Sequence, residues 1–235
     1  MILKRLIKGT QDYLKRVQNP YPEAQQTLFQ FSSPADLALW NIFSDAEYGG
    51  KSTAELRLSE EVPGSAELCG QFSTQVADEG AHERLKRSGF CGIHSKARVV
   101  EIKGYLDLED FDTLVFRVRG DGRKYLANLR TENWIVGERS HDVWQAFLFA
   151  REGEWTDVEI PLDRFLLTWR GKLVETRVEM NPKRILSLGI SLAGGADLQP
   201  DGSFRLGLRA ILARNSSVIM SSAQLKQRLE EESRR

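Results

Sequence analysis

The chain has 235 residues, 41% of them hydrophobic, which is enough to bury one sizeable core and does not require two domains. Its 33 basic residues balance 33 acidic ones, so no overall field favours nucleic acid or an anionic membrane, and any contact with a polyanion would have to be local. No stretch approaches the roughly 18 apolar residues of a membrane span, and basic residues interrupt the apolar ones where a secretory signal would need a continuous run.

Residues 1–18 are predicted to form a basic amphipathic helix, because Leu3, Leu6 and Ile7 begin one apolar stripe and the positive charges lie largely off it. Such a helix docks on a partner or a membrane surface, belongs to an organellar targeting sequence, or packs on its own domain, and the sequence leaves all three open. Two prolines then end the helix. The expected organisation is an N-terminal segment (1–22), a central domain (23–214) and a charged C-terminal helix or tail (215–235).

The central domain contains about ten short segments of strand character, separated by clusters of Gly, Pro, Asp and Asn. Because no helical pattern lies between them, they predict an all-β domain, an antiparallel sandwich of the jelly-roll type. The segments are TLFQF (27–31), STAELRLS (52–59), AELCGQFST (66–74), GFCGIHSKA (89–97), TLVFRVRG (113–120), KYLANLR (124–130), WQAFLFA (144–150), WTDVEIP (155–161), ILSLGISL (185–192) and FRLGLRAIL (204–212).

The tetrapeptide Gly49-Gly50-Lys51-Ser52 resembles the end of a phosphate-binding loop. The first glycine of that motif would fall at Asp45, and the motif needs a helix N-terminus after it to meet the phosphates. The residues that follow alternate as a strand does. We therefore interpret this stretch as a turn and expect no nucleotide.

A second glycine-rich stretch, Gly120-Asp121-Gly122, lies between two segments with a period of two. With Arg119 it also contains the tripeptide associated with integrin adhesion. Alternation on both sides predicts two half-buried strands, and the glycines supply the positive φ angles of a tight turn. The prediction is a β-hairpin that joins two strands of the main sheet, in preference to an adhesion loop or a phosphate loop.

The two cysteines, Cys69 and Cys91, occur in similar contexts, LCGQF and FCGIH, which suggests neighbouring strands. Buried free thiols are the simplest interpretation, because a disulfide would need an oxidising compartment. No metal or cofactor is expected, since the histidines show no paired spacing, and no nucleophile motif supports an enzyme. The histidines are His82, His94 and His141.

The five tryptophans divide into two groups. Trp40, Trp144 and Trp155 lie in or beside strand patterns and are expected in the core. Trp134 and Trp169 lie in the turn-rich stretches TENWIVGERS and LLTWRGK, where an exposed ring can stack on a sugar or anchor a protein interface. Packing under their own loops is the alternative.

Seven blocks occur in an order that is more specific than any single motif. They are WNIFSDAEYGGKSTAEL (40–56), GFCGIHSKA (89–97), FDTLVFRVRGDGRKYLANLRTENW (111–134), VWQAFLFA (143–150), WTDVEIP (155–161), TWRGK (168–172) and LGISL (188–192). This succession resembles the complex I intermediate-associated protein 30 family, and most of all its plant and algal members.

The family's signature positions fall in two blocks of this sequence. We interpret them first as residues that hold the fold, and we expect the Asp45 carboxylate to accept hydrogen bonds from backbone amides. The positions are Trp40, Ser44, Asp45, Gly49, Gly50 and Ser52 in the first block, and Arg119, Gly120, Asp121, Gly122, Arg123 and Tyr125 in the second.

The resemblance implies a galactose-binding-like jelly roll in a non-catalytic assembly factor of mitochondrial respiratory complex I. It also implies binding to membrane-arm intermediates and other assembly factors on the matrix side, without a cofactor or nucleic acid. The candidate interface residues are Leu3, Leu6, Ile7, Trp134 and Trp169, and the N-terminal helix would supply any peripheral contact with the inner membrane. The alternative is a jelly-roll module that binds carbohydrate or another ligand.

Overall fold

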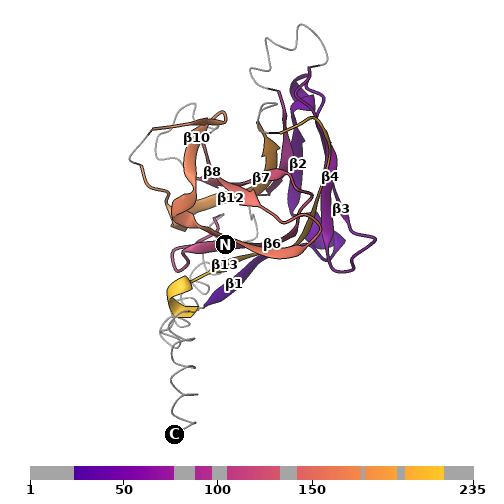
Figure 1. The fold of residues 1–235 in the computed structure, drawn as a ribbon. Helices are drawn as coiled ribbons and strands as arrows, with labels where there is room; N and C mark the ends of the chain where they lie inside the picture. The colour runs from indigo at the N-terminus through magenta and orange to yellow at the C-terminus, as the bar shows by residue number, and fades with distance from the viewer. Residues whose placement is uncertain are drawn as a thin grey trace, which may run out of the picture.

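The computed structural model describes residues 24–76, 88–96, 105–132, 142–175, 178–194 and 199–219. In these residues two antiparallel sheets form a β-sandwich, and β6 and β13 run beneath β7, β8 and β12 in the view of Figure 1. Sheet A has the strand order β3-β4-β13-β6-β9, with β1 also paired to β13. Sheet B has the order β11-β10-β8-β7-β12-β5-β2.

All ten predicted segments fall on strands, so the expected antiparallel sandwich is confirmed. Sheet A consists of β1 (Gln25–Gln30), β3 (Thr53–Leu58), β4 (Ala66–Phe72), β6 (Thr113–Arg119), β9 (Trp155–Pro161) and β13 (Gly202–Arg214). Sheet B consists of β2 (Trp40–Ser44), β5 (Phe90–Ser95), β7 (Lys124–Thr131), β8 (Asp142–Phe149), β10 (Leu166–Trp169), β11 (Lys172–Leu173) and β12 (Ile185–Ala193). The described helices are short: α2 (Pro34–Leu37), η1 (Asp45–Tyr48), η2 (Leu162–Arg164) and η3 (Pro182–Arg184).

Strand β13 is the long central strand of sheet A. It pairs with β4 and β1 on one side and with β6 on the other. Its register with β6 shifts between Leu208 and Ala210, so Arg209 is an extra residue in the strand. Leu208 and Ile211 are both buried across this bulge, although they are three positions apart. The bulge thus keeps apolar residues facing the core along both halves of a 13-residue strand.

The core lies between the two sheets and is formed by alternate residues of each strand. Sheet A contributes residues such as Leu68 and Phe116, and sheet B contributes Leu148, Ile190 and the fully buried Tyr125. Because every second residue of these strands points inward, the remaining residues form two outer faces, one on each sheet. Those two faces carry the candidate functional surfaces.

The predicted hairpin at Gly120-Asp121-Gly122 is wrong in its pairing. Strand β6 ends at Arg119 in sheet A, whereas β7 begins at Lys124 in sheet B, and the two strands do not pair. The turn instead carries the chain from one sheet to the other, beside a second crossing between β8 and β9. Gly120 donates its N–H to Arg151 O (3.0 Å) in that crossing, and Gly122 has the expected positive φ of 83°.

Three further expectations need correction. Trp155 is not a core residue: it is half-buried on the outer face of sheet A, with the Arg209 guanidinium over its ring, whereas Trp40 and Trp144 are buried as expected. Cys69 lies on β4 in sheet A and Cys91 on β5 in sheet B, so the two strands are not hydrogen-bonded neighbours; both thiols are free. Trp169 lies at the end of strand β10, which pairs with β8, and not in a loop. The turn in that stretch consists of Arg170 and Gly171, both with positive φ, between β10 and β11.

The described part of the C-terminal segment is one helical turn at 216–219. Asn215 caps it, because its side-chain oxygen accepts the N–H of Val218 (3.1 Å). Residues 220–235 and the predicted N-terminal helix lie outside the described residues. None of the helices in the described ranges has the length and apolar character that crossing a membrane requires.

Candidate functional site: two outer faces on a braced sandwich

The first signature block is a buried carboxylate site. Asp45 is fully buried, and its Oδ1 accepts the N–H of Ser52 (2.9 Å) while its Oδ2 accepts the N–H of Gly89 (2.6 Å) and of Phe90 (3.3 Å) and the hydroxyl of Ser52 (3.1 Å). A Cβ on Gly50 would lie 2.2 Å from the Asp45 carboxyl carbon. The carboxylate therefore ties the turn after β2 to the start of β5, and Gly50 leaves the room that it needs.

The turn at Gly49 and Gly50 is not a phosphate loop. Gly49 ends a 3₁₀-helix with a φ of 95°, and Ser52 leads directly into strand β3, so a strand and not a helix follows this turn. Lys51 donates to the side chain of Gln75 (3.3 Å). The interpretation of this stretch as a turn is confirmed.

The second signature block holds the crossing between the sheets. The Asp121 carboxylate accepts the N–H of Arg123 (3.1 Å), the N–H of Arg205 (2.7 Å) and the hydroxyl of the buried Tyr125 (3.0 Å). Burial, and then the charge of Asp121, raise the pKa of Tyr125 far above its usual value, so this hydroxyl stays protonated and donates. Asp121 thus connects the sheet-crossing turn to β13 in sheet A and to β7 in sheet B.

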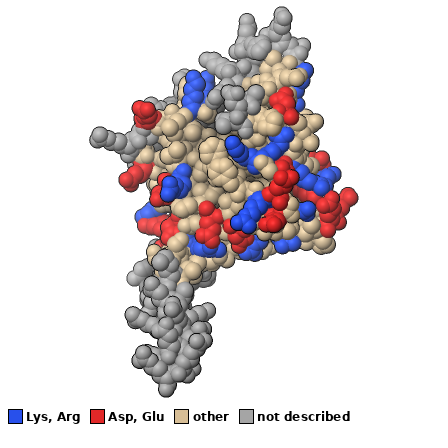
Figure 2. Space-filling model, viewed as in Figure 1, with Lys and Arg blue, Asp and Glu red and all other residues tan. Residues whose placement is uncertain are grey.

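The outer face of sheet A is charged, and most of its charges are paired across strands. Glu67 lies near Arg57 (3.4 Å) and Arg205 (3.1 Å), and Arg205 also contacts Glu61 (3.0 Å). Charges of both signs are mixed in the lower part of Figure 2, where β6 and β13 lie. This face therefore carries charges of both signs, many of them in ion pairs, and no one sign dominates.

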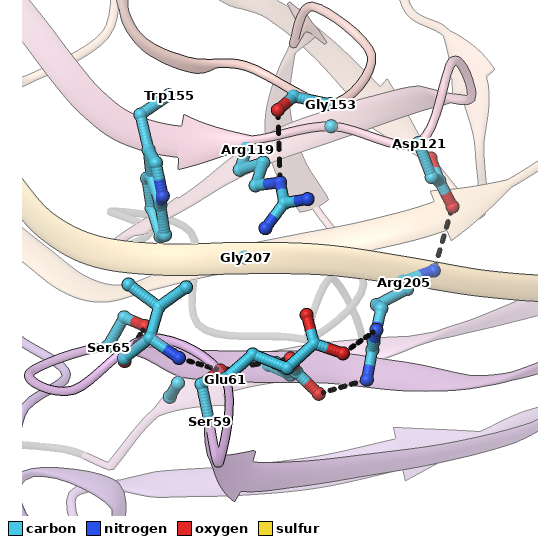
Figure 3. Close-up of a pocket in the computed structure, with 13 residues that line it drawn as sticks. Ser59, Glu61, Ser65, Arg119, Asp121, Gly153, Trp155, Arg205 and Gly207 are labelled. Carbon is cyan, nitrogen blue, oxygen red and sulfur yellow. Dashed lines mark hydrogen bonds and ion pairs between the residues drawn. The ribbon is translucent and has the colours of Figure 1, made fainter.

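A small cavity of about 110 Å³ opens on this face, between the β3–β4 loop and strands β4, β13, β6 and β9. Figure 3 shows Trp155 and Arg119 on one side of β13, and Glu61 and the Arg205 side chain on the other. Gly207 forms the floor, and a Cβ there would lie 3.1 Å from both the Arg119 Cβ and the Trp155 ring. Typical small-molecule sites occupy roughly 300–1,000 Å³, so this cavity suits a single side chain and not a sugar or nucleotide.

The outer face of sheet B is mainly uncharged, and its described edge carries an apolar stripe. We use that name for Phe147 and Phe149 on β8, Leu166 on β10 and Leu173 on β11. Between 51% and 62% of the surface of each is exposed. The two phenylalanine rings lie 5.4 Å apart and nearly parallel, and uncharged side chains cover the part of Figure 2 over β7 and β8.

Beside the apolar stripe, four polar side chains form a ladder across β10, β8, β7 and β12. The Thr168 hydroxyl lies 2.9 Å from Gln145 Oε1, Gln145 Nε2 donates to Asn128 Oδ1 (2.7 Å), and Asn128 Nδ2 donates to Ser191 Oγ (2.8 Å). Each amide uses one N–H in the ladder, so the ladder fixes these side chains on the sheet. This arrangement is rigid and polar, next to a row of exposed rings.

The predicted interface residues are only partly described. Trp169 is 42% exposed, lies on the hairpin that carries Leu166 and Leu173, and has the Arg170 guanidinium 4.8 Å above its ring. Leu3, Leu6, Ile7 and Trp134 lie outside the described residues, as do His82 and His141. Among the described residues, no group of three or more His, Cys, Asp or Glu side chains is placed to hold a metal ion.

Sequence reasoning missed the apolar stripe, although β8 gave a signal. In this strand, Trp144, Ala146 and Leu148 alternate toward the core, but Phe147 and Phe149 make the opposite face apolar as well. A strand that is apolar on both faces implies that its second face also meets something.

The architecture defines a class of protein. The fold is similar to a family 11 carbohydrate-binding module from Clostridium thermocellum, with a TM-score of 0.53 and 14% identity over 81% of this chain and 95% of that one. A family 30 carbohydrate-binding module of a cellulosomal cellulase from the same organism gives a TM-score of 0.50 and 13% identity, over 82% and 98%. The chain therefore has the galactose-binding-like jelly-roll fold of such modules.

Sequence relationship is more specific. Residues 29–208 match the family described as Complex I intermediate-associated protein 30 (CIA30), and the chain belongs to this family. It is 31% identical to "Complex I intermediate-associated protein 30, mitochondrial" of Drosophila melanogaster, over 79% of this chain and 61% of that protein. The Mus musculus protein of the same name is 30% identical over 74% and 53%. The chain thus spans between half and two thirds of the length of these relatives.

Proposed function

We propose that this chain acts in mitochondria as a non-catalytic assembly factor for respiratory complex I. Membership of the CIA30 family supports this role, and so do the names of the relatives, which describe association with complex I intermediates in mitochondria. The finer part of the proposal is that the chain binds intermediates of the membrane arm, together with other assembly factors, on the matrix side of the inner membrane.

The observation that carries a binding role is the apolar stripe. Four large apolar side chains, each more than half exposed, lie along one edge of sheet B with Trp169 on the same hairpin. Exposed apolar clusters of this kind mark protein interaction sites, because their burial in a complex removes apolar surface from water. The stripe lies on strands β8, β10 and β11, whose main chain is already ordered by strand pairing. Binding there therefore loses little conformational entropy of the main chain.

The test is complementation of cells that lack their CIA30-family protein, with complex I followed on native gels. We expect Phe147→Gln with Phe149→Gln to leave a folded protein, because both side chains are exposed, and to leave fewer assembled complexes and less co-purified intermediate. The matched control is Ile42→Gln, which changes a 45% exposed apolar residue on β2 at the opposite edge of the same sheet. Full rescue by the Phe147 and Phe149 variant would show that the apolar stripe is not the binding surface.

The second candidate function is carbohydrate binding. The exposed pair of rings beside the polar ladder would offer a sugar both ring faces for stacking and groups for hydrogen bonds. The test is calorimetry with the β-1,3-1,4-mixed-linked tetrasaccharide found in the family 11 module. We expect no binding, because the phenylalanine rings stack on each other and the ladder's amides are engaged with one another.

A further inference from the structure

On the outer face of sheet A, one arginine of β6 has an acid opposite it on β9 and the next arginine does not. Arg117 on β6 lies directly opposite Asp157 on β9 and holds its carboxylate with two hydrogen bonds, Nε to Oδ1 (2.8 Å) and Nη2 to Oδ2 (2.9 Å). Two residues further along both strands, Arg119 lies opposite Trp155. The position that would hold the acid partner of Arg119 is therefore occupied by a tryptophan ring.

Arg119 is held in one orientation, but no carboxylate among the described residues forms an ion pair with it. Its Nε donates to Gly153 O (3.1 Å), which fixes the plane of the guanidinium and leaves the Nη1 and Nη2 edge for a second acceptor. Figure 3 shows the Arg119 guanidinium between Trp155 and Asp121, with this edge turned away from Gly153 and toward β13 at Gly207. The Asp121 carboxylate already accepts three hydrogen bonds from Arg123, Arg205 and Tyr125, so its own partners lie elsewhere.

A second arginine lies beside the first, and it too lacks an acid partner in the part of the chain that the structure describes. Arg209, the extra residue of the β13 bulge, has its guanidinium carbon 4.3 Å from the centre of the Trp155 ring. No described carboxylate forms an ion pair with either Arg119 or Arg209, whereas Arg57, Arg117, Arg205 and Arg214 on the same face each have one. Two arginines without a described acid partner thus lie next to Trp155, Arg209 over its ring and Arg119 opposite it on β6, beside a cavity of about 110 Å³.

We infer that Arg119, Arg209 and Trp155 form a binding site for an acidic segment of a protein partner. A carboxylate side chain fits the cavity, whose volume corresponds to about four molecules of liquid water. Its two oxygens would accept hydrogen bonds from Nη1 and Nη2 of Arg119. Arg117 already holds the Asp157 carboxylate by two hydrogen bonds. An apolar residue next to that acid would cover the Trp155 ring, and a second acid would meet Arg209.

Charge complementarity selects this occupant over others. Three acids line the cavity. Glu61 and Glu67 are balanced by Arg57 and Arg205, and Asp121 accepts three hydrogen bonds, so these acids repel an incoming carboxylate less than isolated charges would. The cavity is too small for a nucleotide or an oligosaccharide. The site lies on the sheet opposite the apolar stripe, so the inference stands independently of the assembly role.

The experiment uses the full chain and a synthetic peptide that alternates Glu and Leu, labelled with a neutral fluorophore, at physiological salt. Its isostere alternates Gln and Leu. We expect the acidic peptide to bind the unmodified protein, the isostere to bind much more weakly, and Arg119→Gln with Arg209→Gln to weaken acidic binding by about tenfold or more. Arg164→Gln, which removes one exposed positive charge beyond the other end of β9, is the matched control and should leave binding unchanged.

Several results would overturn the inference. They are absence of acidic peptide binding at millimolar concentration, equal binding of the isostere, equal binding by the double variant, or an equal loss in the Arg164 control. Vesicles of phosphatidylcholine and phosphatidylglycerol form a separate arm. Vesicle binding that depends on Arg119 and Arg209, without peptide binding, would assign the site to lipid headgroups instead. Thermal unfolding of every variant shows that the fold is intact, and Arg119→Lys with Arg209→Lys tests whether charge alone is enough.

Discussion

The buried Asp45 site allows a sharp test of what the first signature block does. Asp45→Ala removes a carboxylate that accepts four hydrogen bonds, three of them from backbone N–H groups. A buried donor left without a partner costs about 1–3 kcal/mol, and partial access of water to the strand ends reduces the sum. We expect a loss of roughly 3–5 kcal/mol of unfolding free energy, large for a single substitution.

Gly50→Ala should act through the same carboxylate. The three atoms nearest to the added Cβ all belong to Asp45, at 2.2, 2.4 and 2.6 Å. The carboxylate would have to move away and give up some of its hydrogen bonds, which we expect to cost roughly 2–4 kcal/mol. In the Asp45→Ala background those atoms are absent, so the same glycine substitution should cost less than about 1 kcal/mol.

The measurement is urea unfolding of the four proteins of this cycle, followed by tryptophan fluorescence and circular dichroism, with an osmolyte added if Asp45→Ala is too unstable alone. Gly64→Ala is the control for backbone effects, because Gly64 has a φ of 74° and open space around the added Cβ. If Gly50→Ala costs the same in both backgrounds, the glycine is not there to accommodate Asp45, and the argument fails.

Three further predictions concern single residues. Gly122→Val should lower the unfolding free energy by roughly 1–3 kcal/mol in urea titrations, because Gly122 has a φ of 83° that a β-branched residue rarely adopts; an unchanged midpoint would contradict this. Burial raises the pKa of the Cys91 thiol to about 12, so a disulfide reagent at pH 8 should leave Cys91 unmodified until denaturant is added, as mass spectrometry of the labelled peptides can show. The hydrogen bonds from Arg117 hold the pKa of Asp157 below the 3.8 that is usual for an aspartate, so this pair stabilises the fold above that pH and the contribution disappears as pH falls further. Asp157→Asn should therefore flatten the acid limb of a plot of stability against pH, and an unaltered acid limb would show that the pair contributes nothing.

The strands themselves could be predicted from the sequence, because alternation is a local property. VFRVR and YLANL each have one apolar and one more polar face, and a sandwich requires that pattern on both of its sheets. Pairing is not local. Alternation around Gly120 to Gly122 is equally compatible with a hairpin and with a crossing between sheets. The choice is made by the hydrogen bonds of Gly120 with Arg151 O and Gly153 N, which are 31 and 33 residues away in the sequence.

Two short strands escaped prediction for a different reason. The turn between β10 and β11 has positive φ at both Arg170 (50°) and Gly171 (72°), the conformation of a two-residue hairpin. Arginine is an unusual residue at the first of these positions, so the sequence lacks the Asn-Gly or Asp-Gly signal that marks such turns. The sequence therefore predicts a loop at Trp169, although this residue pairs with Lys172 across the hairpin.

The candidate site also contains residues that the local sequence reveals and residues that it does not. Asp45 and Asp121 could be identified from short motifs, since each bonds backbone groups within a few residues of itself as well as distant ones. The set of Arg119, Arg209 and Trp155 could not, because β6, β13 and β9 are brought together only by strand pairing and by the bulge at Arg209. The apolar stripe likewise depends on β8 and β10 being neighbours, a pairing that the short β10 pattern did not reveal.

The arrangement of the two faces explains why a binding scaffold would use this fold. The apolar stripe and the set around Arg119 point outward from opposite sheets, and a core about 10 Å thick separates those sheets. A protein seated on one face therefore leaves the other uncovered. Asp121 links the two sheets. Its carboxylate accepts hydrogen bonds from the Arg205 N–H of β13 in sheet A and from the Tyr125 hydroxyl of β7 in sheet B. A rigid connection of this kind would hold two partners at a fixed distance and orientation without any moving part in the sandwich. Asp121→Ala should then weaken binding at the Arg119 site as well as stability. Disruption of the apolar stripe should leave acidic peptide binding intact, which the peptide assay measures on the same samples.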